Sequence, residues 1–140
     1  MSSDDLFARQ PTVIQLKATT KGEAIDELVD RLAETVALNT DQRESARASI
    51  KKRESAMSTG IGCGFALPHA SADFISEPVM IVGRCAKPLA FDAIDGELVD
   101  VIVLFLVPKG EFQKQLNALS NVAKLLHSPA LREQVRQRWR

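Results

Sequence analysis

The chain has 140 residues, 45% of them hydrophobic, which suits one domain with a single substantial core. Lysine plus arginine equal aspartate plus glutamate at 18 each, so no overall charge favours nucleic acid or an anionic membrane as a partner. Two cysteines make no disulfide framework, the N-terminus does not resemble a signal peptide, and the longest apolar run, 101–107, is too short to cross a bilayer. These features predict a cytoplasmic protein without membrane insertion.

The N-terminal segment predicts an arm, a strand and a helix. Residues 1–11 are polar and are expected to form a loose arm ahead of a domain over 12–140. Apolar residues over 13–16 suggest a short strand. Behind it, Thr20 and the glutamate three residues later have the spacing of a capping box. Apolar residues at helical spacing then predict an amphipathic helix over 21–37.

A second helix is predicted over 41–54. Asn39 and Thr40 can both cap its beginning. Ala46 and Ile50 mark the face that is expected to be buried.

The C-terminal half predicts two strands and two further helices. Residues 79–85 mix β-branched and apolar side chains, and 98–107 is a nearly continuous apolar run of the kind found in central strands. Apolar residues between 116 and 126 lie at helical spacing, and Ser128-Pro129 can begin a last helix. The apolar face of that last helix would consist of Leu131, Val135 and Trp139. This order predicts a single α/β domain with a mixed β-sheet flanked by helices.

Between the second helix and the strands lies the unusual stretch STGIGCGFALPHA, residues 58–70. Its glycines, Gly60, Gly62 and Gly64, match neither a Walker loop nor a dinucleotide fingerprint, and the residues after them do not open a helix. We interpret the glycines as positions that need unusual backbone angles or a close approach. The stretch is expected to be a mobile loop that delivers His69 behind a rigid proline.

Two other chemistries have little support in the sequence. The residues that could ligate a metal are Cys63, His69, Cys85 and His127. Their spacing matches no compact zinc pattern, so no metal site is predicted. His69 could also pair with Ser58 or Asp73 in a triad, or with Cys63 as a nucleophile, but no nucleophile elbow surrounds them. His127 is interpreted as a helix-end residue that interacts with the last carbonyls.

His69 could itself be a nucleophile. A neutral imidazole has a lone pair on one ring nitrogen and can accept a phosphoryl group there. The other ring nitrogen must then donate a hydrogen bond, typically to a backbone carbonyl, to fix the tautomer. From the pattern alone, a structural histidine remains the commoner interpretation.

The stretch STGIGCGFALPHA resembles the active-site signature of the fructose/mannitol-type IIA domains (EIIA type 2) of the bacterial phosphoenolpyruvate-dependent phosphotransferase system (PTS). The likeness continues upstream in the Arg53-Glu54 pair and downstream in FDAIDGELVDVIVLFLVP and LNALSNVAKLL. It covers residues 12–135 and is closest to the stand-alone nitrogen-regulatory IIA proteins.

The resemblance implies a mixed sheet flanked by helices and a phosphohistidine mechanism. His69 would accept a phosphoryl group at Nε2 from HPr or its nitrogen-branch paralogue, and Arg53 would position or neutralise that group with its bidentate fork. The residues that would bind the phosphoryl group or line the loop are Ser58, Thr59, Gly60, Gly62 and Gln115. No cofactor is implied, because the donor's N–P bond drives the transfer.

One departure from the family pattern concerns Gln115, where relatives often carry a second histidine. A glutamine amide can donate a hydrogen bond to a phosphoryl oxygen but cannot become cationic. We expect acceptance of phosphate at His69 to survive this change, at an altered rate.

Three functions therefore stay open. The chain could pass phosphate to a IIB domain in sugar transport, or carry it as a nitrogen- or potassium-type regulatory signal. It could also be a regulatory binding module that docks onto target proteins and is switched by phosphorylation.

Overall fold

The computed structural model describes residues 12–56, 58, 60–91, 93, 96–111, 113, 117, 120–121, 124 and 128–138. The secondary-structure elements are, in chain order, β1 (Thr12–Leu16), α2 (Lys21–Thr35), α3 (Thr40–Ala56), β2 (Gly60–Gly62), β3 (Phe65–Ala66), β4 (His69–Ala72), β5 (Val79–Leu89), β6 (Val99–Pro108), the 3-10 turn η1 (Lys109–Glu111) and α5 (Pro129–Arg138).

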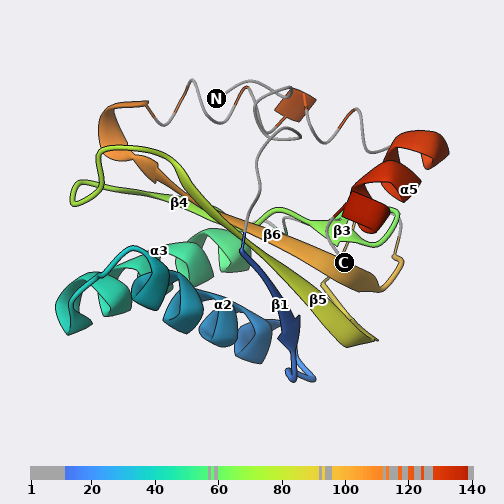
Figure 1. Ribbon diagram of the computed structural model, residues 1–140, viewed down its shortest axis with the longest axis horizontal. Coiled ribbons are helices and arrows are strands. Elements are labelled where there is room, and N and C mark those ends of the chain that lie inside the picture. The colour runs from blue at the N-terminus through green and yellow to red at the C-terminus, as the bar shows by residue number, and fades with distance from the viewer. Residues whose placement is uncertain are drawn as a thin grey trace.

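The six strands form one mixed sheet in the order β1-β5-β6-β3-β2, with β4 also paired to β6. β5 and β6 are antiparallel, whereas β1 runs parallel to β5, and both β3 and β4 run parallel to β6. α2 and α3 cover one face of the sheet, and α5 lies on the opposite side (Figure 1). The predicted fold class, a single α/β domain with a mixed sheet flanked by helices, is confirmed.

The apolar run at 98–107 is the central strand β6, as predicted, and it supplies both cores. Its alternate residues Ile102, Leu104 and Leu106 pack with α2 and α3 in the larger cluster. Val101, Val103 and Phe105 pack on the other face with Val135 of α5. A strand that is buried on both faces needs a continuous apolar sequence, which is why this run lacks the usual alternation.

Local capping sets the beginnings of the two N-terminal helices. Thr20 Oγ1 accepts a hydrogen bond from Glu23 N at 3.2 Å, as its position in the sequence predicts. α2 ends at Thr35, two residues before the predicted end, and Ala37 has a left-handed φ of 55°. At α3, Asn39 Oδ1 accepts from Gln42 N at 2.8 Å and Gln42 Oε1 accepts from Asn39 N at 3.0 Å. This reciprocal pair makes Asn39 the cap and places Thr40 inside the helix.

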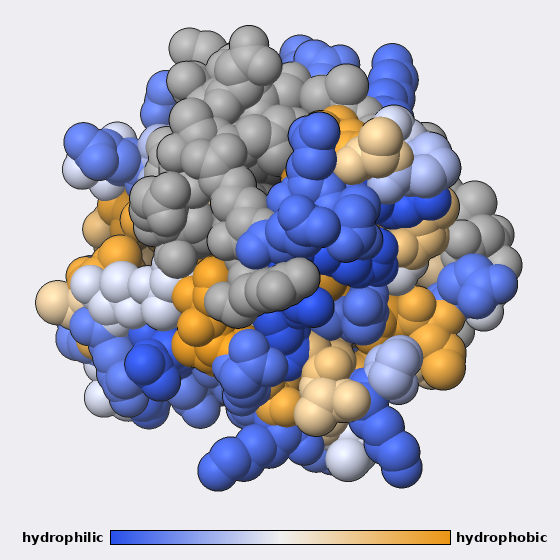
Figure 2. Space-filling model, turned by 45° about the vertical axis from the view of Figure 1, so that its right-hand side comes forward, coloured by the Kyte–Doolittle hydropathy of each residue, from blue (hydrophilic) through white to orange (hydrophobic). Residues whose placement is uncertain are grey.

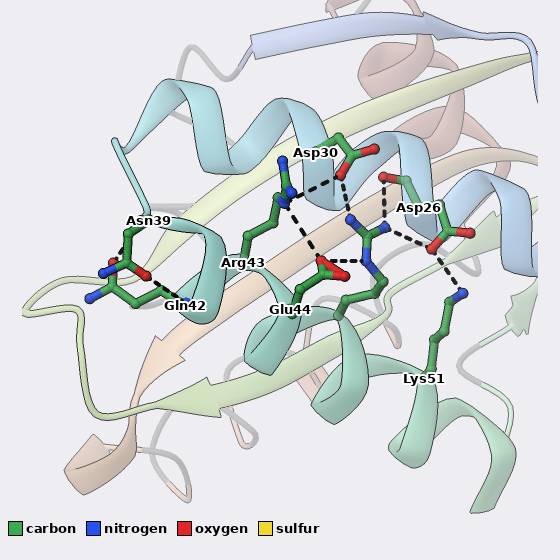
Figure 3. A network of polar contacts seen from close by, with 8 residues as sticks. Asp26, Asp30, Asn39, Gln42, Arg43, Glu44 and Lys51 are labelled. Carbon is green, nitrogen blue, oxygen red and sulfur yellow. Dashed lines mark hydrogen bonds and ion pairs between the residues drawn. The ribbon is translucent and has the colours of Figure 1, made fainter.

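A charged network joins α2 to α3 on the side away from the sheet (Figure 3). Arg47 Nη1 donates to Asp26 Oδ1 at 2.7 Å, and the same guanidinium also contacts Asp30 and Glu44. Lys51 Nζ lies 2.8 Å from the same Asp26 oxygen. The interface of the two helices is thus apolar next to the sheet and ionic at its rim.

Of the remaining predictions for the C-terminal half, some fall on described residues and can be compared with the structure, and the others do not. α5 confirms the last helix, with Ser128 Oγ accepting from Leu131 N at 3.4 Å and Val135 buried. The residues described between 113 and 124 are helical, but the apolar stripe predicted there lies outside the described residues, as do Trp139 and the arm over 1–11. Over the part of the chain that is described, no helix combines the length and apolar character that crossing a bilayer requires.

Candidate functional site

His69 lies on a strand, so the prediction of a mobile loop at this position is wrong. In both β3 and β4 each residue pairs with the β6 residue 36 positions later, from Phe65 with Val101 to His69 with Phe105. The two short strands are therefore one line of chain in constant register. Pro68 interrupts the ladder because it has no N–H, while its carbonyl still accepts from Phe105 N at 2.9 Å.

Side chains along this line alternate between the two faces of the sheet. Phe65 and Leu67 are buried in the core on the α5 side, whereas Ala66 and Ala70 are buried on the side of α2 and α3. His69 continues the first series and lies in register with Phe105, which belongs to the α5-side core. The alternation of large and small residues in FALPHA indicates an extended segment with two faces. The three glycines before it favoured the prediction of a loop instead.

A tight turn between β2 and β3 uses the glycines. Gly62, Cys63 and Gly64 have φ values of 95°, 59° and 90°, and the last two match a type I′ hairpin turn of two residues. Gly60 serves another purpose, since a Cβ there would lie 2.9 Å from Ala93. Both predicted uses of glycine, unusual angles and close approach, are confirmed. In this structure the glycines allow a tight turn and a close approach between segments of the same chain.

The imidazole of His69 is oriented by the backbone two residues before it. Nδ1 lies 2.8 Å from the carbonyl oxygen of Leu67. A carbonyl oxygen can only accept, so Nδ1 carries the proton, and in the neutral ring Nε2 carries the lone pair. The ring is half-buried. The structure thus provides the tautomer that a nucleophilic Nε2 requires.

Ser58 ties the glycine segment to the segment that follows β5. Its hydroxyl donates to the carbonyl oxygen of Phe91 and accepts from Gly60 N at 3.1 Å. The single hydroxyl proton is used in the first of these bonds, so in this structure Ser58 holds the loop in place. Of the other residues expected at the site, Gly60 and Gly62 are buried, whereas Thr59 and Gln115 lie outside the described residues.

Arg53 lies in the last turn of α3, beside the strand that carries His69. It lines an open pocket of about 350 Å³ together with Ser49, Lys52, Ala56 and Ser71. The four α3 residues recur at helical spacing and therefore share one face, while Ser71 follows His69 by two positions on β4. His69 itself does not line this pocket. The pocket is basic and polar, and sequence reasoning missed Ser71 and Lys52 as part of it.

Glu54, next to Arg53, is the one charged side chain buried among the described residues, with 4% of its surface exposed. Lys21 Nζ lies 3.4 Å from its Oε1, and the same ammonium lies 5.3 Å from the centre of the Phe91 ring. Buried carboxylates are rare unless they are paired. The end of α3, the beginning of α2 and the Phe91 segment thus meet at this pair. Glu54 stands four residues after Ile50, in line with the buried face of α3, and this spacing was the signal in the sequence for its burial.

The described His, Cys, Asp and Glu residues include no group of three or more that could hold a metal ion. Cys63 and Cys85 are thiols that are not joined in a disulfide, and both are half-buried. Burial, together with the charge of Asp100, raises the pKa of Cys85 to about 11. This thiol is therefore protonated at neutral pH and is a poor nucleophile.

Comparison with known proteins places this geometry in a family. The model of the family described as "Phosphoenolpyruvate-dependent sugar phosphotransferase system, EIIA 2" matches residues 5–138. Among curated proteins, a nitrogen regulatory protein of Bradyrhizobium diazoefficiens is 31% identical over 137 residues, which cover 97% of this chain and 87% of that protein. The fructose-specific EIIABC component of Bacillus subtilis is 29% identical over 135 residues, but these make up only 21% of its length.

A solved structure supports the same assignment. The crystal structure of the nitrogen regulatory protein IIA-Ntr from Neisseria meningitidis matches with a TM-score of 0.77 and 27% sequence identity. The match covers 89% of this chain and 83% of that one. The resemblance inferred from the glycine and Pro-His signature is therefore confirmed at the level of the family and the fold.

Proposed function

This chain belongs to the EIIA 2 family of the phosphoenolpyruvate-dependent sugar phosphotransferase system, and from that premise we propose that His69 is its phosphoryl acceptor. The observation that carries the proposal is the hydrogen bond from Nδ1 of His69 to the carbonyl of Leu67. It leaves the lone pair on Nε2, the atom that must attack phosphorus.

The transfer step follows from this tautomer. The Nε2 lone pair of His69 attacks the phosphorus of a phosphohistidine on the donor protein, the donor's P–N bond breaks, and its electron pair returns to the donor nitrogen. The His69 ring gains positive charge as the new P–N bond forms. The Leu67 carbonyl, already accepting from Nδ1–H, stabilises that charge without reorganisation. The donor would be HPr or its nitrogen-branch paralogue.

Arg53 is proposed to bind the phosphoryl oxygens. It lies at the end of α3 next to β4, in a pocket that also contains Lys52 and Ser71. A guanidinium suits the planar array of phosphoryl oxygens because it donates two parallel hydrogen bonds. Gln115 is expected to donate an amide hydrogen bond in place of the second histidine, so that Gln115→Ala slows labelling without abolishing it.

Labelling with phosphoenolpyruvate tests the acceptor. The protein is incubated with enzyme I, HPr and phosphoenolpyruvate, and acid-labile phosphate is measured. We expect wild type to be labelled, His69→Gln to stay unlabelled, and the matched variant of the only other histidine, His127→Gln, to be labelled like wild type. Equal labelling of His69→Gln would overturn the proposal. For Arg53, the comparison is Arg53→Gln with Arg31→Gln, which changes an exposed arginine of α2, and a slower rate in the first alone supports its role.

A second function is favoured by the likeness to nitrogen regulatory proteins. In this case phosphate on His69 changes the affinity for a regulatory target and is not passed to a IIB domain. One assay, which follows whether the phosphate leaves His69, distinguishes the two functions. Phosphorylated protein is mixed with a IIB domain encoded nearby in the genome, and loss of label from His69 to IIB supports sugar transport, whereas retention of the label supports regulation.

A further inference from the structure

A polar contact joins α5 to the turn between β2 and β3. Arg136 Nη2 donates to the carbonyl oxygen of Cys63 at 3.1 Å and to Asp100 Oδ1 at 2.9 Å. The guanidinium carbon also lies 4.7 Å from the centre of the Phe65 ring. We call these four residues, Arg136, Cys63, Asp100 and Phe65, the α5 clamp. One side chain of the C-terminal helix thus holds the turn, the start of β6 and the start of β3.

The turn is shaped to receive this contact. A Cβ on Gly64 would lie 2.6 Å from both Arg136 Nη2 and Asp100 Oδ1, so only glycine leaves room for the ion pair. The carbonyl of Gly64 accepts from Asp100 N at 2.9 Å and from Val101 N at 3.1 Å. Arg84 Nη1 donates to the carbonyl oxygen of Arg136 at 3.1 Å, which anchors the end of α5 to β5.

The clamp matters because α5 has little apolar attachment. Val135 is its one buried residue among those described. Figure 2, which brings the right-hand side of Figure 1 forward, shows hydrophilic residues over the centre of this face and hydrophobic patches around them. A helix with one buried apolar side chain depends on directional contacts for its position, because so small a buried area contributes only a few kcal/mol.

A short series of contacts connects the α5 clamp to His69. Val135 packs in the same cluster as Phe65 and Leu67, and the Leu67 carbonyl fixes the His69 tautomer. Next to Leu67, the missing N–H of Pro68 removes one hydrogen bond from the ladder with β6. The orientation of the Leu67 peptide therefore depends more on side-chain contacts from α5 than it would in an uninterrupted strand.

We propose that Arg136 is a positioning residue for phosphoryl transfer at His69, acting through the β2–β3 turn and the Leu67 carbonyl. This inference rests on the proposed function for its effect on transfer. Its effect on the tautomer of His69 can be measured without any phosphate. By holding β3 against β6, Arg136 keeps the proton of the imidazole on Nδ1 and Nε2 in line for attack.

The first measurement reads the tautomer directly. Two-bond proton–nitrogen correlation spectra of unphosphorylated, nitrogen-15-labelled protein, recorded where the ring is neutral, distinguish Nδ1–H from Nε2–H. Wild type and Arg136→Lys, which keeps one donor and the charge, are expected to show Nδ1–H. Arg136→Ala is expected to show a mixture of the two tautomers. The control is Gln134→Ala, which truncates an exposed side chain of the same helix and should resemble wild type.

The second measurement reads transfer. Initial rates of labelling are recorded over a range of concentrations of the phosphorylated donor protein. A positioning role predicts that Arg136→Ala lowers kcat about 10- to 100-fold with KM nearly unchanged, and that Arg136→Lys recovers part of the loss. A contact with the donor protein would instead raise KM.

The inference is overturned if folded Arg136→Ala keeps the wild-type tautomer and kcat, or if Gln134→Ala is equally impaired. Should Arg136→Ala fail to fold, Asp100→Asn is used, because it weakens the ion pair and preserves the shape of the side chain. A normal tautomer in folded Asp100→Asn would then overturn it. If wild type accepts no phosphate but the tautomer depends on Arg136, the proposed function fails and the structural coupling stands.

Discussion

The carbonyl oxygen of Leu67, in the link between β3 and β4, accepts a hydrogen bond from Nδ1 of His69, the first residue of β4, across 2.8 Å. The bond leaves the lone pair of the neutral ring on Nε2, the nitrogen that the proposed function requires as the nucleophile. We therefore expect the phosphate on His69 to be attached at Nε2. Nitrogen-15 and phosphorus-31 spectra of the phosphorylated protein distinguish the two isomers, and phosphate on Nδ1 would contradict this interpretation of the site.

Substitutions at three glycines can separate the free-energy cost of left-handed backbone strain from the cost of a clash with the α5 clamp. Gly96 has a φ of 72° and no atom within 4 Å of the position that a Cβ would take, so Gly96→Ala should cost only left-handed strain, about 1–2 kcal/mol of unfolding free energy. Gly64 has a φ of 90° and also faces Arg136 and Asp100, so Gly64→Ala should cost about 1 kcal/mol more. Gly110→Ala, in open space, should change stability by less than about 0.5 kcal/mol. Denaturant unfolding measures all three, and equal losses for the first two would count against the α5 clamp.

The reactivity of Cys85 should depend steeply on pH. Burial, reinforced by the negative charge of Asp100, raises its pKa from 9.0 to about 11. Because only the thiolate is alkylated, the rate of reaction with iodoacetamide should rise about tenfold per pH unit between pH 8 and pH 10. Mass spectrometry of the peptide that contains Cys85 follows this rate. A plateau near pH 9, as in the unfolded chain, would contradict the burial of this thiol.

The same shift has a consequence for stability. Above pH 9 the unfolded chain loses the thiol proton, whereas the folded chain retains it up to about pH 11. The unfolded state is therefore favoured progressively as the pH rises through this window. We expect the unfolding free energy of wild type to fall more steeply there than that of Cys85→Ala, and parallel curves would show that Cys85 makes no contribution.

Asp26 should stabilise the protein only while it is ionised. Burial alone would raise its pKa, but hydrogen bonds from Lys51 and Arg47 outweigh that effect and lower the pKa from 3.8. A lowered pKa means stability that is present at neutral pH and is lost as the pH falls below 3.8. Since the side chain is 40% exposed, we expect Asp26→Asn to cost only about 0.5–1 kcal/mol at pH 7.

The difference between wild type and Asp26→Asn should shrink in acid and in high salt, because both remove the charge interaction. Glu77→Gln, an exposed acid in the loop before β5, is the matched control and should leave stability unchanged. Urea unfolding at pH 7 and pH 3 measures both variants. An undiminished difference at pH 3 would show that packing, not charge, explains the effect.

Most of the helices could be predicted because their signals are local. The caps at Thr20 and Asn39 and the helix start at Ser128 each involve residues three apart in the sequence. The strands around His69 could not be predicted in the same way. Gly60 is a poor strand former by itself, and Gly64 lies in the turn between β2 and β3. Glycine is needed at these two positions because Ala93 and the Arg136–Asp100 pair would clash with a Cβ there, and these contacts are distant in the sequence.

In the candidate site, too, local features could be predicted from the sequence and long-range contacts could not. His69 could be named from its motif, and Arg53 from its place in the family pattern. The partner of Ser58 could not, because the carbonyl of Phe91 that accepts its proton lies 33 residues away. The burial of Glu54 against Lys21, also 33 residues away, has the same cause. A polar side chain has many possible long-range partners, and only the packed chain selects one of them.

The amino-acid sequence alone was enough to predict α2, α3, α5 and the central strand β6, and to single out His69 as the candidate acceptor, because periodicity, caps and a short motif involve residues only a few positions apart. Tertiary packing set the remainder. The register of β4 against β6 paired His69 with Phe105, and the Leu67 carbonyl selected the ring nitrogen that carries the proton. A shift of one residue in that register would turn the imidazole to the opposite face, because side chains alternate along a strand.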